Sequence, residues 1–413
     1  MSPESKRKRR TTQTEFAAVG GDFRRVSLAY AVNLVVVPEV TASAGEFHLA
    51  IQALDPVTRN VLWSGSFNGS RSHYLETMND AGEALRNAIR PASSGASPRP
   101  ATGSETELAF REGEYHLDRF RVHHEPADFD ASIKALQHAL ELDPKLADAA
   151  ADIAHLHGLR EPADAGEIEK WARRAIEIDA KCGRGYFMLA SVTKALNDSL
   201  RAAAFAPEYA LAQLGLGQAL ASSTSLAFAA SRQARLLDPL YLYAPLAEAG
   251  YLHQLGRTSE AFAILDRQVV GINPEMSYGR WTETSLMIEL GWLDRADPSF
   301  KDIDKELAKQ PPMPYALGEI RRVPTLAKNG YIDDSYAILN RAVEGGAPIP
   351  YDWLVQDRRL DRLRRDDRYF RVHEYAKDRY ESMLKTLDEA SSRGELPAYL
   401  DQPIADLRSQ IRN

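Results

Sequence analysis

The sequence has only one cysteine, Cys182, and no apolar run long enough to cross a membrane. A single cysteine excludes an intramolecular disulfide and fits a reducing compartment. A membrane span needs about 20 consecutive apolar residues, whereas the nearest run covers residues 34–37 and is closed by Pro38. The basic run at residues 6–10 is followed by no apolar stretch, so it does not have the form of a signal peptide. We therefore expect a cytoplasmic protein.

An excess of positive charge is also absent, because the formal net charge is −7. This charge disfavours attraction of the whole protein to nucleic acid or to an anionic membrane. A Gly-x-Gly-x-x-Gly loop and a His-Arg-Asp loop are missing, so the sequence gives no sign of a kinase. Hydrophobic residues make up 44% and charged residues 26%, which is the balance of a soluble globular protein.

The N-terminal region combines strand and helix patterns. Residues 1–24 are expected to form a disordered basic tail. Apolar residues alternate in residues 26–36, 47–53 and 61–67, which predicts three strands of an antiparallel meander. Helical spacing over residues 73–89 predicts a helix after them. A stretch rich in proline, serine and glycine at residues 91–104 then predicts a linker, so residues 25–90 are expected to form a small α+β domain.

The remaining chain has helical periodicity with breaks at a regular interval. Intervals between successive breaks are 36, 27, 32, 35 and 38 residues, counted on Pro144, Ala180, Pro207, Pro239, Pro274 and Pro312. A helical period near 34 residues is typical of a solenoid of helical hairpins. Proline at the breaks fits, because it cannot continue the second helix of a hairpin.

The spacing within the units resembles the tetratricopeptide repeat. Small residues at Ser132 and Ala139 would let two helices approach closely, with Leu136 filling the space between them. Similar positions recur in five units, so residues 105–345 are similar to degenerate tetratricopeptide repeats. The unit at residues 179–207 looks too short for two full helices, and the unit at residues 274–312 is weak. Residues 346–413 are expected to form C-terminal capping helices.

Both ends of the chain are similar to a bacterial protein family. The end of the repeats, at residues 353–370, resembles the terminal segment of bacterial repeat proteins, although Asp367 stands where that family has proline. Residues 30–89, which include Leu62-Trp63, resemble the second half of a TolB-amino-terminal-like (FlgO-like) domain. That domain precedes such repeats in winged-helix regulators, adenylate cyclases and kinases. The resemblance implies a signalling context and a truncated N-terminal domain.

Candidate chemical sites are few. A metal site needs three or four convergent ligands, and adjacent His123 and His124 point apart, so the histidines are expected to have polar or packing roles; the others are His116, His155 and His157. Cys182 lies in a turn without a nucleophile elbow. The charged runs at residues 105–114 and 357–371 are expected to be solvated helices with ion pairs. We expect no enzyme activity, no metal and no cofactor.

A binding surface therefore remains the main hypothesis. In a helical solenoid the first helix of each hairpin faces the concave side. The positions expected there, as partner-binding residues, are His155, Phe187, Ser191, Leu214, Gln218 and Leu246. They include no basic clamp for a peptide carboxylate, so the groove would suit an apolar or helical protein segment. Equally, a self-curled superhelix or the chain's own C-terminal helix at residues 374–392 could fill it.

The sequence thus predicts a mainly α fold, a tetratricopeptide-type α-solenoid preceded by a small α+β domain. The predicted function is that of a scaffold that binds a protein or peptide partner in the concave groove. One alternative is the sensory part of a truncated transcriptional regulator or signalling protein, and another is an enzyme with an unrecognised site. Self-association through the N-terminal half-domain is also expected.

Overall fold

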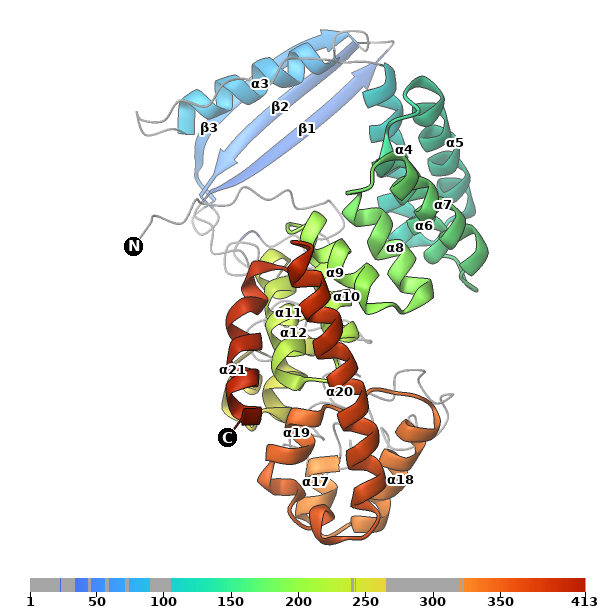
Figure 1. Cartoon of the computed structure of the whole chain (residues 1–413). Coiled ribbons are helices and arrows are strands. Elements are labelled where there is room, and N and C mark those ends of the chain that lie inside the picture. The colour runs from blue at the N-terminus through green and yellow to red at the C-terminus, as the bar shows by residue number, and fades with distance from the viewer. Residues whose placement is uncertain are drawn as a thin grey trace. The chain divides into compact units, whose positions relative to one another are not determined.

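The structure is a computed structural model that falls into two compact units, residues 1–162 and residues 163–413 (Figure 1). It describes Phe23 and residues 34–43, 46–55, 59–70, 74–89, 105–238, 241, 243–264, 320 and 323–412. The predicted linker at residues 91–104, the weak repeat at residues 274–312 and nearly all of the predicted tail lie outside these residues.

The first unit begins with the predicted antiparallel meander. Strands β1 (Val35–Ser43), β2 (Glu46–Leu54) and β3 (Val61–Ser70) lie in the order β1-β2-β3, and helix α3 (Tyr74–Ile89) follows. The end expected for the first strand, residue 36, is wrong, because β1 runs through Pro38 to Ser43. Residues 26–33 of that prediction lie outside the described residues. Among the described residues β1 is an edge strand, and edge strands tolerate proline because only one side of the strand takes part in a ladder of hydrogen bonds.

The core of this small domain lies between the sheet and α3. Alternate residues of β2 are buried, namely Phe47, Leu49 and Ile51, as period-two geometry requires. They pack with Ala81 of α3 and with half-buried side chains of β3 and α3, which are Trp63, Phe67, Met78 and Leu85. The helix therefore covers the face formed by β2 and β3.

Three further helices complete the first unit: α4 (Glu105–His123), α5 (Pro126–Leu142) and α6 (Ala147–Gly158). Helices α4 and α5 form a hairpin in which Ser132 Oγ donates a hydrogen bond to the Gly113 carbonyl at 2.7 Å. A Cβ on Gly113 would lie 2.5 Å from the Leu136 side chain, so only glycine fits this close approach. The small-residue positions that the repeat resemblance predicted are thus confirmed as packing positions.

The second unit continues with α7 (Ala165–Ile178), α8 (Gly183–Thr193), α9 (Leu196–Phe205), α10 (Ala210–Ala219), α11 (Thr224–Leu237), α12 (Tyr243–Gln254) and α13 (Thr258–Ile264). Each helix packs against the next one. The interpretation of residues 179–207 as too short for two helices is wrong, because α8 and α9 are both present. The chain reverses within two residues because Lys194 adopts a left-handed conformation with a φ of 56°.

The last part holds a hairpin and a C-terminal cap. Helices α17 (Val323–Lys328) and α18 (Ile332–Glu344) precede α19 (Tyr351–Gln356), the short turns η3 (Arg358–Leu360) and η4 (Leu363–Arg365), α20 (Tyr369–Ser392), η5 (Ala398–Leu400) and α21 (Asp401–Arg412). The single helix expected over residues 357–371 is wrong, because two short turns precede α20, whereas the expected ion pairs are present, for example between Arg368 and Asp366. Leu360 and Leu363 are fully buried and three residues apart, a spacing that suits 3₁₀ turns.

The predicted fold class is confirmed for the described residues. They are mainly helical, with antiparallel helix pairs of the tetratricopeptide type, and they begin with a small α+β part. The charged run in α4 also behaves as predicted, since Arg111 forms ion pairs with Glu107 and Glu114 on the same helix.

Candidate partner-binding surface

The C-terminal helices cover one face of the hairpins in the second unit. Helix α20 contacts α9, while α21 and η5 contact α11 (Figure 1). Because α9 and α11 are the second helices of their hairpins, we call this side the second-helix face. The cap and the hairpins share one core, with these members: Leu200, Ala203, Leu216, Leu220, Leu226, Ala227, Ala230, Tyr251, Tyr380, Met383, Leu387, Ala390, Leu400, Ile404 and Leu407.

A buried carboxylate fastens the cap to the start of α11. Asp352, on α19, is 5% exposed. Its Oδ1 accepts a hydrogen bond from the Thr224 amide at 2.8 Å, and its Oδ2 accepts from the Ser225 amide at 3.1 Å and from Ser223 Oγ at 2.9 Å. The amides in the first turn of a helix have no partner within the helix, so a carboxylate is well suited to satisfy them.

A guanidinium fastens the cap to the end of α12. Arg359 Nη2 donates to the carbonyl oxygens of His253 at 3.0 Å and Gln254 at 3.3 Å, and Asp357 holds the same guanidinium at 2.6 Å. A cation at a helix C-terminus satisfies carbonyls that lack partners within the helix. The cap therefore binds two consecutive helices through opposite charges. Asp352 bonds the N-terminus of α11, and Arg359 bonds the C-terminus of α12.

Two polar contacts extend the attachment to α9 and α10. Arg201 forms an ion pair with Glu395 at 3.1 Å. Tyr399 donates to Gln213 Oε1 at 2.6 Å, and Gln213 in turn donates to the carbonyl oxygen of Ala203 at 3.0 Å. The second-helix face of α9 and α11 is thus occupied by the chain's own C-terminal helices.

Residues 374–392, which were expected as one possible occupant of the groove lined by first helices, belong to α20. The core that this helix forms with the hairpins contains none of the six predicted groove residues. Those six residues belong to other packing clusters or to the surface. Helix α20 contacts α9, on the second-helix face, and the shared core also includes Leu216 of α10 and Tyr251 of α12.

The structure places Leu214 and Leu246 inside the packing. Leu214 is 6% exposed and packs with Ala234 and Ala244. Leu246 is 4% exposed and packs with Ala249, in a cluster that also holds Leu252 and Ala261. The expectation that these two leucines form an open surface is wrong, because first helices also pack against the neighbouring hairpin.

The other predicted residues of the second unit are more accessible. Phe187 is half-buried, and its ring packs edge-on against Tyr209 with 5.5 Å between ring centroids. Ser191 is half-buried and donates to the Met188 carbonyl at 2.7 Å, while Gln218 is exposed. Gly215, on α10, is also half-buried. We use the name first-helix face for four residues of α8 and α10: Phe187, Ser191, Gly215 and Gln218. His155 lies on α6 in the other unit and is half-buried.

The histidines have packing and hydrogen-bonding roles. His157 packs edge-on against Phe129 with 5.5 Å between ring centroids. His116 Nδ1 lies 2.7 Å from Asp128 Oδ1. Arg119 Nε donates to both oxygens of Asp128, at 2.9 and 3.0 Å. These bonds from His116 and then Arg119 lower the pKa of Asp128 below its ordinary value.

The contact of Asp128 with His116 and Arg119 escaped the sequence analysis. The available signals were an acidic residue in the first turn of α5 and two potential donors three residues apart on α4. The hydrogen bonds between Asp128 and these two side chains hold α4 and α5 together. Within the part of the chain that the structure describes, no group of three or more histidine, cysteine or acidic side chains could hold a metal ion. Cys182 is buried at the start of α8, where its Sγ accepts from the Gly185 amide at 3.4 Å.

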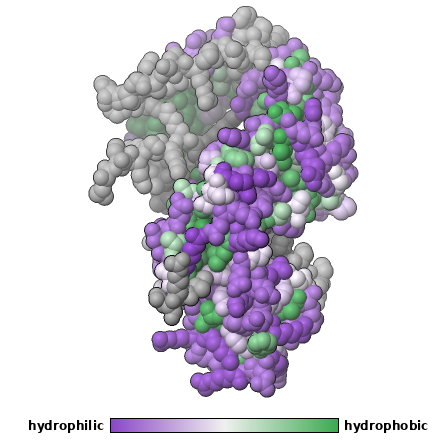
Figure 2. All heavy atoms as spheres, viewed as in Figure 1, coloured by the Kyte–Doolittle hydropathy of each residue, from purple (hydrophilic) through white to green (hydrophobic). Residues whose placement is uncertain are grey.

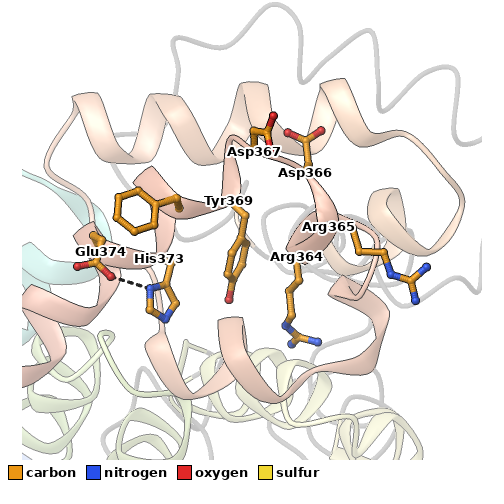
Figure 3. A pocket seen from close by; sticks show the side chains of 8 residues that line it. Arg364, Arg365, Asp366, Asp367, Tyr369, His373 and Glu374 are labelled. Carbon is orange, nitrogen blue, oxygen red and sulfur yellow. Dashed lines mark hydrogen bonds and ion pairs between the residues drawn. The ribbon is translucent and has the colours of Figure 1, made fainter.

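A shallow depression of about 430 Å³ lies at the start of α20 (Figure 3). Asp366 and Asp367 point to one side of it, and Tyr369 and Arg364 point to the other. Charges on its walls are mostly compensated, because His373 bonds Glu374 at 2.9 Å and Arg364 and Asp366 have ion-pair partners. Most of the described surface seen in Figure 2 is hydrophilic. We therefore assign no ligand to this depression.

Comparisons with known proteins assign neither a family nor a function to this chain. No family model matches the chain, and no curated protein matches it. Among solved structures, the chain is similar to the crystal structure of MamA protein, at 19% identity and a TM-score of 0.28, over 41% of this chain and 92% of that chain. A likeness of this size carries no information on function. Among the described residues, no helix is both long and apolar enough to span a membrane.

Proposed function

We propose that this protein is a binding scaffold that contacts a protein partner through the first-helix face of α8 and α10. The observation that supports the proposal is the asymmetry of the hairpins in the second unit. Their second-helix face is occupied by α20 and α21, whereas the first-helix face keeps an exposed Gln218 and half-buried Phe187 and Ser191. Among the described residues, the C-terminal cap does not pack on Phe187, Ser191 or Gln218, which supports this side as the one open to a partner.

The chemistry of this face favours an uncharged, partly apolar segment. Its four residues carry no charge, and Phe187 presents an aromatic ring, a residue type that is enriched in protein interfaces. A Cβ on Gly215 would lie 3.4 Å from the Phe187 ring, so glycine leaves a shallow space beside that ring. A helix with an apolar stripe, or an extended apolar peptide, would place a side chain there.

The test introduces a charged side chain at half-buried Ser191 or exposed Gln218, so that no fully buried side chain is removed. Ser191→Arg and Gln218→Arg place a guanidinium on the first-helix face, where an apolar partner would have to desolvate it. Each variant should lose most of the partner recovered with the full chain in an affinity purification read by quantitative mass spectrometry. Leu236→Arg is the matched control, because Leu236 is exposed on the second helix α11. Circular dichroism should show an unchanged helical content for all three.

Two outcomes would contradict the proposal. Retention of the partner by both first-helix variants would show that this face is not used. Equal loss of the partner in the Leu236→Arg control would place the contact elsewhere or show a general effect of charge.

A further inference from the structure

Strand β1 leaves apolar side chains uncovered on the face of the sheet that carries α3. Val36 lies opposite Ala53, and Val40 lies opposite Leu49. Directly opposite residues of an antiparallel pair point to the same face, and Leu49 and Ala53 are fully buried on the α3 side. Val36 and Val40 share that face, yet they are 38% and 54% exposed.

The exposure arises because α3 is too narrow to cover three strands. The core beneath α3 is built from β2, β3 and α3 alone. The outer edge of β1 also has no strand beside it among the described residues, where β1 pairs with β2. An edge strand with exposed aliphatic side chains is a template for pairing with another chain.

We propose that β1 pairs with β1 of a second copy of this chain, antiparallel and with the two-fold axis at Pro38. In this register residue 36 of one copy faces residue 40 of the other, so Val36 pairs with Val40 on both sides of the axis. Such pairs of β-branched residues stabilise a sheet. The sequence around Pro38 is self-complementary in this sense, which favours a second copy over an unrelated strand.

Glu39 and Pro38 of β1 both favour this register. Glu39, the charged residue of β1, faces Val37 of the other copy, so two carboxylates do not meet. Proline has no N–H to donate. With the axis at Pro38 the two missing N–H groups fall in one pair, so the ladder is interrupted at a single position and can form on both sides of it. Any other symmetric register would interrupt the ladder at two positions.

The first experiment measures the mass of the full chain by sedimentation equilibrium over a range of concentrations. We expect a dimer whose dissociation constant rises about tenfold or more in Val40→Lys, because each lysine replaces the valine that faces Val36 and has to lose part of its hydration in the interface. Leu62→Lys is the matched control on β3, where Leu62 is 60% exposed, and it should leave the dimer unchanged. A monomer at every concentration, or equal weakening by both variants, would overturn the proposal.

The second experiment tests the register by disulfide formation. A mixture of Val36→Cys and Val40→Cys chains should cross-link under mild oxidation, since directly opposite positions are about 4.5–5.5 Å apart. Val36→Cys alone should not cross-link, because its two copies would lie four residues apart along the strand, about 14 Å. The natural Cys182 is buried and serves as the background. Equal cross-linking of Val36→Cys alone would overturn the register, and neither experiment depends on a partner at the first-helix face.

Discussion

Replacing Asp352 by alanine should destabilise the second unit by removing the bond between the cap and α11. The carboxylate accepts bonds from two backbone amides and one hydroxyl across 127 to 129 residues of sequence. A hydrogen bond to a charged group contributes about 1.5–3 kcal/mol. Ser223 and Thr224 are fully buried, so water cannot easily replace the lost acceptor. Two amides at the lower limit give a loss of about 3 kcal/mol in the free energy of unfolding.

Urea denaturation followed by circular dichroism measures this loss, and amide hydrogen exchange localises it. Asp352→Asn keeps one carbonyl oxygen and should lose about half as much, roughly 1.5 kcal/mol. Asp378→Ala is the control on the exposed surface of α20 and should stay within about 0.5 kcal/mol of the natural protein. Exchange should accelerate in the first turn of α11 in Asp352→Ala. An unchanged urea midpoint together with unchanged exchange at Thr224 and Ser225 would refute the reasoning.

Three further predictions concern other contacts. The hydrogen bonds from Arg368 lower the pKa of Asp366 from 3.8 to about 2. The ionised carboxylate therefore stabilises the fold above pH 4, and this stabilisation is lost as the pH falls toward 2. Asp366→Asn should make the stability less dependent on pH between pH 4 and 2, measured by circular dichroism. Arg359→Ala should cost about 1–2 kcal/mol in urea denaturation, because α12 loses its C-terminal cation, and Arg359→Lys should restore part of it. Gly217→Ala should lower the thermal midpoint, because a Cβ would lie 2.8 Å from Ser231 Oγ; an unchanged midpoint would contradict the close approach of α10 and α11.

The helix pairs were predictable because their packing follows local spacing. Ser132, Leu136 and Ala139 recur at helical intervals and form the hairpin contact that this spacing indicates. In the sequence, Pro144, Pro207 and Pro239 follow the ends of α5, α9 and α11, because proline cannot continue the interior of a helix. Pro274 and Pro312 lie outside the described residues. The short α8–α9 hairpin was missed because a left-handed residue other than glycine, Lys194, makes the turn and leaves no sequence signal.

The attachment of the cap and the accessible residues of the first-helix face were harder to predict, because both depend on contacts between distant segments. The bonds of Asp352 to the start of α11 have no local pattern, since a carboxylate near a tyrosine and a tryptophan looks like an ordinary surface residue. Leu214 and Leu246 were misassigned because a hydrophobic period shows that a helix has apolar positions and does not show which neighbour covers them. Which residues of the first-helix face stay accessible is decided by the stacking of hairpins.

The most direct test of the central claim places a photo-cross-linking amino acid at position 218 of the full chain in cells that make it. Position 236, on α11, serves as the control of similar exposure. If the first-helix face binds a protein partner, illumination should give a discrete protein adduct at position 218 that disappears when Ser191→Arg is added, and no such adduct at position 236. The same adducts at both positions, or an adduct at position 236 alone, would contradict the account.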